Sequence, residues 1–118
     1  MKVTKQQVSD FLKALGVPAN LNGYVYLRHA VLLAVQQPDM LKSLTKVLYP
    51  AVAKECNTTW TRVERSMRHA IEHCFTHGDR LLCEKLFRNG YSAQKGKPTN
   101  KQFLATVVDF MMLRGDLK

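Results

Sequence analysis

Apolar residues recur every three or four positions along most of this chain, which is the spacing of amphipathic helices. No segment keeps the alternation that a half-buried strand would show. The first such pattern covers residues 8–15. Thr4 and Gln7 form a capping box before it, and Gly16 provides a C-terminal cap after it. We therefore predict a capped amphipathic helix at the start of the chain.

Further helices are predicted along the rest of the chain. They are expected over 22–37, over the short stretch 40–44, up to Asn57, over 59–76, between Gly78-Asp79 and Asn89-Gly90, and from the Thr99/Gln102 capping box onward. Pro50 fits either the first turn of a helix or a kink in a longer one that begins near Thr45. In the last two helices the residues expected to face inward are Leu81, Leu82, Leu86, Phe87, Phe103, Val107, Phe110 and Met111. The fold class predicted is all-α, a compact bundle of about six helices in one domain.

The central part of the chain is predicted to form a helix-turn-helix. Asn57 tolerates a left-handed turn, and Thr58 or Thr59 caps the helix that follows. On that helix, steps of about 100° per residue separate two faces. The inward face holds Val63, Met67, Ala70, Ile71 and Cys74, and the outward residues are Arg62, Arg65, Arg68, His69 and Glu72. A recognition helix divides its residues in this way.

The charge of the chain favours a polyanionic partner. Its 118 residues hold 18 Lys and Arg against 9 Asp and Glu, a formal charge of +9. The planar fork of Arg62 or Arg65 can donate two hydrogen bonds to guanine O6 and N7. Glu64 can either accept from cytosine N4 or orient Arg68 four residues on. Solvated charges on an exposed helix are the alternative interpretation.

A second basic cluster follows, with Lys85, Arg88, Lys95, Lys97 and Lys101 and no acidic residue between them. Lys95 and Lys97 come just before the capped start of the last helix. Free N–H groups at a helix start beside two lysines suit a phosphate group. A solvated polar loop is the alternative.

Other chemistry finds little support in the sequence. His69 to His73 matches H-x-x-E-H, but a catalytic zinc needs a third ligand, and the neighbouring arginines oppose a cation. No phosphate-binding glycine motif or nucleophile elbow is present. Cys56, Cys74 and Cys83 are interpreted as reduced core residues. No apolar run approaches the roughly 20 residues that span a bilayer. We expect no metal, no cofactor, no enzymatic activity, no membrane contact and a cytoplasmic location.

The motifs TKVLYP, NTT-x-x-RVER-x-x-RHAIE and KPTN, in that order, resemble the C-terminal effector domain of the stage zero sporulation protein A family of response regulators. The resemblance runs from about Val8 to Leu113. It implies a helix-turn-helix domain that binds a duplex box similar to TGTCGAA and activates or represses sporulation-phase genes. Family members also carry an N-terminal receiver domain that this chain lacks. We therefore expect a single effector domain over 1–118 that binds without a phosphorylation signal.

The resemblance also implies roles for individual residues. The positions that match base-reading residues are Arg62, Glu64 and Arg65. The positions expected to face DNA or its phosphates are Thr59, Thr61, Arg68, His69, Lys95, Lys97 and Asn100. Trp60, at the helix start, either touches DNA or shields the turn.

The partners expected from the resemblance are double-stranded DNA, RNA polymerase and a second copy in tandem on adjacent boxes. Two alternatives remain at this stage. One is a basic helical module that binds an acidic protein partner such as a polymerase subunit. The other is a small zinc hydrolase.

Overall fold

The computed structural model describes residues 2–87 and 96–117, and its regular structure in those residues is entirely helical. The elements are α1 (Lys5–Leu15), α2 (Asn22–Gln36), η1 (Pro38–Lys42), η2 (Leu44–Leu48), α3 (Tyr49–Glu55), α4 (Trp60–His77), α5 (Arg80–Phe87) and α6 (Asn100–Leu117). The prediction of an all-α bundle with about six helices is confirmed.

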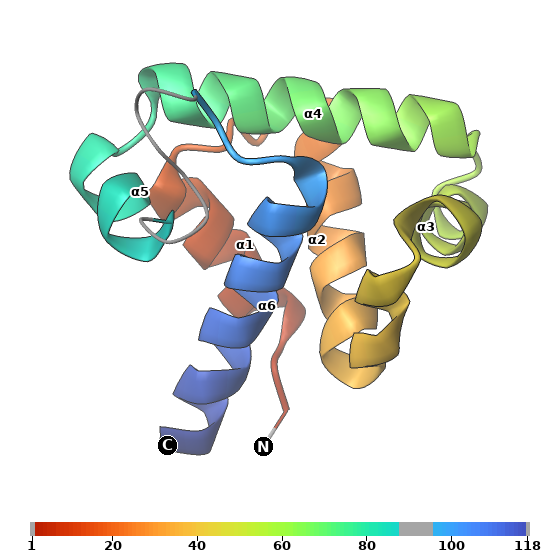
Figure 1. The fold of residues 1–118 in the computed structure, drawn as a ribbon, viewed down its shortest axis with the longest axis horizontal. Helices are drawn as coiled ribbons and strands as arrows, with labels where there is room; N and C mark the ends of the chain where they lie inside the picture. The colour runs from red at the N-terminus through yellow and green to blue at the C-terminus, as the bar shows by residue number, and fades with distance from the viewer. Residues whose placement is uncertain (1, 88–95, 118) are drawn as a thin grey trace.

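The longest helices set the shape of the molecule. α4 lies across one side of the bundle, and α2 and α6 run crosswise beneath it (Figure 1). Both chain ends lie on the side away from α4 (Figure 1). One face of α4 is therefore packed on the bundle, and the other is left to solvent. Within the described residues, no helix is long and apolar enough to cross a membrane.

The predicted signals at the ends of α1 are confirmed. The Thr4 hydroxyl accepts from the Gln7 N–H, and the Gln7 side chain accepts from the Thr4 N–H. Gly16 ends the helix with φ 108°, a left-handed conformation that favours glycine. A side chain at Gly16 would also collide with the backbone of Gly78. The end of α1 therefore packs closely against the turn between α4 and α5.

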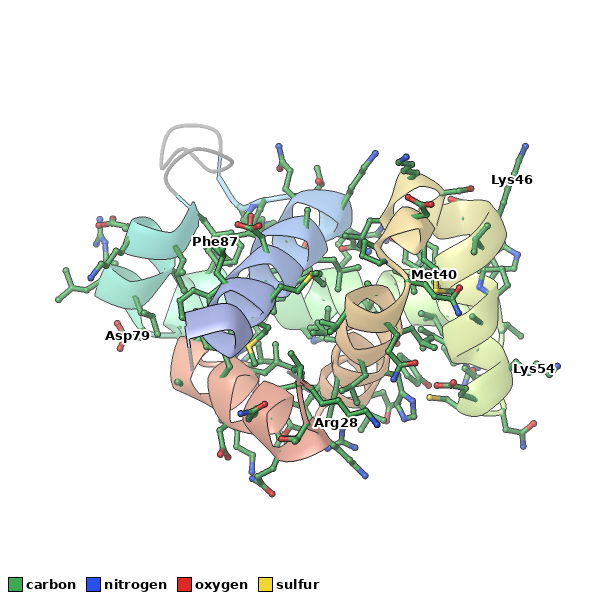
Figure 2. All side chains as sticks on the ribbon, turned by 90° about the horizontal axis from the view of Figure 1, so that it is seen from below. Arg28, Met40, Lys46, Lys54, Asp79 and Phe87 are labelled. Carbon is green, nitrogen blue, oxygen red and sulfur yellow. The ribbon has the colours of Figure 1, made fainter. Side chains whose placement is uncertain are left out.

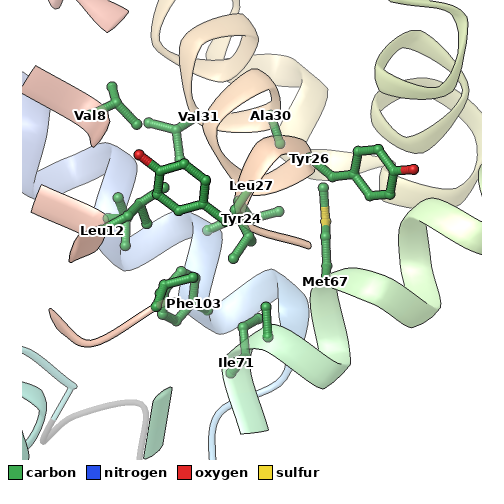
Figure 3. Packing of buried hydrophobic residues seen from close by; sticks show 14 of the residues in the cluster. Val8, Leu12, Tyr24, Tyr26, Leu27, Ala30, Val31, Met67, Ile71 and Phe103 are labelled. Atoms are coloured by element: carbon green, nitrogen blue, oxygen red, sulfur yellow. The ribbon is translucent and has the colours of Figure 1, made fainter. Parts of the chain in front are cut away.

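The core forms where α2 passes under α4 and beside α6. Gly23 lets the backbones of α2 and α4 approach at Ser66, because a Cβ there would collide with the Ser66 carbonyl. Figure 3 shows Leu27 of α2 near Met67 of α4 and Phe103 of α6 in the same apolar cluster. Burial of this shared cluster fixes α4 relative to the rest of the bundle.

The segment between α2 and α3 differs in detail from the prediction. The short helical stretch expected over 40–44 is a 3₁₀ helix over Pro38–Lys42. A π-helical turn over Leu44–Leu48 then runs directly into α3, with Pro50 in the first turn of α3. Pro50 has no backbone N–H and so cannot donate the hydrogen bond that would continue a regular helix. The wider, π-type hydrogen bonding of the turn just before it is consistent with this missing donor. Figure 2 shows Lys46 of this segment and Lys54 of α3 projecting outward.

The predicted inward face of α5 is wrong at Leu81, whose side chain is 81% exposed. The buried residues of α5 are Cys83 and Phe87, one helical turn apart. Leu81 lies about 200° around the helix from Cys83, so it faces solvent. Leu82 and Leu86 pack against the core while staying half-buried, and Phe87 stacks on Phe103 of α6 at 5.3 Å.

The inward residues predicted for α6 are confirmed for Phe103, Val107 and Met111, which are buried. Phe110 is half-buried and stacks on Phe11 of α1, with ring centroids 4.6 Å apart. The predicted end of α5 at Asn89-Gly90 lies outside the described residues.

Candidate nucleic-acid interface

The turn between α3 and α4 is built as the sequence indicates. Asn57 has φ 55°, and the Thr58 N–H donates to the Ala53 carbonyl at 2.9 Å. The Thr59 hydroxyl then accepts from the Arg62 N–H at 3.2 Å and caps α4. Thr59, rather than Thr58, is therefore the cap. After this turn α4 begins at the surface of the molecule, where its first residues are exposed.

The two faces of α4 are separated as predicted. Val63, Met67, Ala70, Ile71 and Cys74 are buried. Arg62, Arg65, Arg68 and His69 are exposed, and Thr59 and Thr61 are exposed beside them at the helix start. Glu72 is half-buried. The structure therefore presents a cationic helix face that rests on an apolar one, as a recognition helix requires.

Glu64 differs from its neighbours because its carboxylate forms an ion pair with the Arg68 guanidinium. The two residues are four positions apart, the spacing at which side chains on a helix meet. This pair matches the interpretation in which Glu64 orients Arg68. Arg62 and Arg65 lie closer to the start of α4 than Arg68 does, and the ion pair with Glu64 involves neither of them.

A groove of about 590 Å³ runs beside α4, between η1–η2 and the start of α6. Its charged lining residues are Lys42, Glu64, Arg68, Glu72, Lys97 and Lys101. Lys97 Nζ lies 3.6 Å from the Glu72 carboxylate, so this lysine is held against α4. The structure thus brings Lys97 to the flank of the helix that carries the arginines. Lys95 lies outside the described residues.

Asn100 sits at the bottom of this groove and is only 9% exposed. Its side-chain amide donates to the Tyr49 hydroxyl at 3.0 Å and to the Glu64 backbone carbonyl at 3.1 Å. The structure therefore uses this side chain inside a joint between α6, α3 and α4, whereas the sequence analysis expected it to face DNA. These two hydrogen bonds satisfy the donors of the Asn100 amide, so the side chain can remain buried.

Tyr49 is the residue of this joint that sequence reasoning missed. It is buried, with 4% of its surface exposed. Burial raises the pKa of the Tyr49 hydroxyl, although the hydrogen bond from Asn100 opposes this effect. A buried tyrosine usually needs a polar partner, but no local signal reveals one 51 residues away.

The start of α6 is closed by the predicted capping box. The Thr99 hydroxyl accepts from the Gln102 N–H at 3.1 Å, and Gln102 Oε1 accepts from the Thr99 N–H at 2.9 Å. The capping prediction is confirmed. Lys97 precedes this capped start in the chain, and its ammonium group is directed to Glu72 of α4.

The remaining features of α4 are Trp60 and the histidines. Trp60 is the first residue of the helix and is 43% exposed. The His73 and His77 rings are in contact, with centroids 4.8 Å apart, whereas His69 is exposed. Among the residues that the structure describes, no group of three or more His, Cys, Asp or Glu side chains is placed to hold a metal ion.

Comparison with known protein families gives a match over residues 8–111, nearly the whole chain. The matching family is described as "Sporulation initiation factor Spo0A C terminal". The helix-turn-helix and the exposed arginines of α4 lie within the matched residues. The chain therefore belongs to the family of C-terminal, DNA-binding effector domains of the sporulation initiation factor Spo0A.

Proposed function

We propose that this domain binds a short duplex box similar to TGTCGAA in the cytoplasm and regulates sporulation-phase genes through it. The observation that supports the proposal is the exposed cationic face of α4, held rigid by its buried apolar face. Arg62 and Arg65 lie near the start of α4, the part of a recognition helix that reaches base edges. In this proposal the two arginines read guanine in the major groove.

The phosphate contacts of the complex come from the flank of α4. Arg68, oriented by Glu64, and Lys97, held near Glu72, both line the groove beside the helix. We assign these two cations to the sugar–phosphate backbone, where they supply affinity but little sequence discrimination. Thr59, Thr61 and His69 are exposed on the same helix and complete the proposed contact surface.

The test is a titration against a duplex with the box and against a scrambled duplex, at two salt concentrations. A specific regulator should prefer the box by about a thousandfold and lose affinity steeply as salt rises. Equal, salt-sensitive binding to both duplexes would contradict the proposed specificity. Binding to neither would favour an acidic protein partner instead.

Arg65→Ala tests the base-reading assignment. We expect it to cost about 1–3 kcal/mol on the box and to reduce discrimination between the two duplexes. Arg80→Ala is the matched control, because it removes the same charge from an exposed position on α5. An equal loss on the scrambled duplex would make Arg65 a phosphate contact.

Lys97→Ala tests the phosphate assignment. Affinity should fall by a similar factor on both duplexes. The slope of log affinity against log salt concentration should become shallower by about one, because one phosphate contact is lost. Lys5→Ala removes the same charge from the exposed start of α1 and is the matched control. A change in the preferred box would contradict this assignment.

We further propose that two copies bind adjacent boxes in tandem and contact RNA polymerase there. Native mass spectrometry on a duplex with two adjacent boxes should show two bound copies, and separating the boxes by half a helical turn should abolish any cooperativity. Binding that is unaffected by this spacing would contradict the tandem arrangement.

A further inference from the structure

Two cysteines from neighbouring helices meet inside the core. Cys74 of α4 and Cys83 of α5 have their sulfur atoms 3.9 Å apart. Both are unbonded thiols, and they are 1% and 3% exposed. Both sulfurs also lie near the Leu15 carbonyl, at 3.4 and 3.8 Å. The proposed DNA contacts use neither thiol.

The surroundings of this pair favour reaction between the two sulfurs. The Asp79 N–H donates to the same Leu15 carbonyl at 3.0 Å, so the turn that joins α4 and α5 is fixed beside the pair. The two sulfurs need to approach by roughly 2 Å to reach the disulfide bond length of about 2.0 Å. The hydrogen bond with Cys83 and burial both raise the pKa of the Cys74 thiol. Cys83 lies on the short helix α5, so it is the thiol that local opening of α5 exposes first.

Access to the pair depends on α5. This helix has eight residues, and its exposed side includes Leu81. Short helices with few buried residues open locally at lower free-energy cost than core helices do. Cys56, by contrast, is half-buried at the end of α3 and belongs to another part of the bundle. The pair is thus a thiol site separate from Cys56.

We propose that Cys74 and Cys83 form a dithiol site that low-molecular-weight disulfides, such as oxidised glutathione, convert into an intramolecular disulfide. The Cys83 thiolate attacks one sulfur of the small disulfide, forms a mixed disulfide and releases one thiolate. Cys74 then loses its proton and attacks the Cys83 sulfur, which releases the second small thiolate. The protein loses two electrons and two protons, and one small disulfide becomes two thiols.

The bond would fasten α5 to the C-terminal half of α4. It closes a short loop in the unfolded chain and so should raise the temperature of unfolding. Arg62 and Arg65 stand at the other end of α4, so affinity for the box should not change. The proposed site therefore stabilises the domain under oxidising conditions without switching its DNA binding.

The experiment uses the full chain with Cys56→Ser, incubated with oxidised glutathione under native conditions. Intact mass should fall by the mass of two hydrogen atoms, with no glutathione adduct, and dithiothreitol should restore it. The unfolding temperature should rise in the oxidised form. A lasting glutathione adduct, or two unreacted thiols in folded protein, would overturn the proposal.

Matched variants carry one thiol of the pair. Cys56→Ser with Cys83→Ser, or with Cys74→Ser, should keep its mass or gain glutathione, and neither should lose two hydrogens. If a variant does not fold, peptide mapping of the oxidised wild-type chain decides the question. A bridge between residues 74 and 83 supports the site, and bridges that involve Cys56 contradict it.

Discussion

Replacing Asn100 by alanine tests the joint beneath the proposed DNA-binding face. The substitution removes both hydrogen bonds of the buried amide, one to the Tyr49 hydroxyl and one to the Glu64 carbonyl. It also leaves the Tyr49 hydroxyl buried without this partner. The perturbation is therefore internal, although the residue stands just behind the exposed lysines of the groove.

The expected cost follows from these contacts. Each hydrogen bond contributes about 1 kcal/mol, and an unsatisfied buried hydroxyl adds to the loss, so Asn100→Ala should destabilise the domain by about 2–3 kcal/mol. For a domain of this size, the unfolding temperature should fall by roughly 10 °C. Such a loss is a large part of the roughly 5–15 kcal/mol that stabilises most domains.

The assay is urea unfolding followed by circular dichroism, with thermal unfolding in parallel. Asn20→Ala is the matched control, because it removes the same amide from an exposed turn. Tyr49→Phe should cost about 1 kcal/mol alone and less than that in the Asn100→Ala background, since the two residues share a bond. A loss below about 0.5 kcal/mol for Asn100→Ala would refute the reasoning. Unchanged stability with weaker binding to every duplex would instead support a phosphate contact at this residue.

Two other predictions concern the same interior. Gly23→Ala should destabilise the domain by about 1–3 kcal/mol in urea unfolding, because the new Cβ collides with the Ser66 carbonyl and forces α2 and α4 apart; unchanged stability would show that the helices can separate freely. The raised pKa of Tyr49 means that the folded state holds this proton more tightly than the unfolded chain does. The resulting stability should be full below about pH 10 and should be lost as pH rises from there through the folded pKa. Urea unfolding on both sides of this window should show a steeper loss in the wild type than in Tyr49→Phe, and equal losses would contradict the burial argument.

The features that could be predicted from the sequence depend on neighbours in the chain. The capping residues Thr4, Thr59 and Thr99 act on N–H groups three residues away, and Gly16 and Asn57 adopt left-handed backbone that few residues tolerate. Such local chemistry identifies helix ends before the fold is known. The division of α4 into an apolar and a cationic face is equally local, because it needs only the helical period.

The features that could not be predicted depend on contacts between distant segments. The Asn100 amide contacts Tyr49 only because the fold brings the first residue of α6 to the first residue of α3. The sequence around Asn100 is that of an exposed helix start, so it gives no sign of this buried contact. The orientation of α5 depends on which of several leucines finds space in the core, and Leu81 does not. Periodicity leaves such choices open when most residues of a short helix are apolar.

Trp60 is a natural fluorescent probe within the proposed contact surface. It is the chain's single tryptophan, it is the first residue of α4, and nearly half of its side chain is exposed. Fluorescence excited at the red edge of protein absorption therefore comes from one place, the start of α4. A label-free spectrum can thus report on that end of α4 alone, while the tyrosines of the core stay dark.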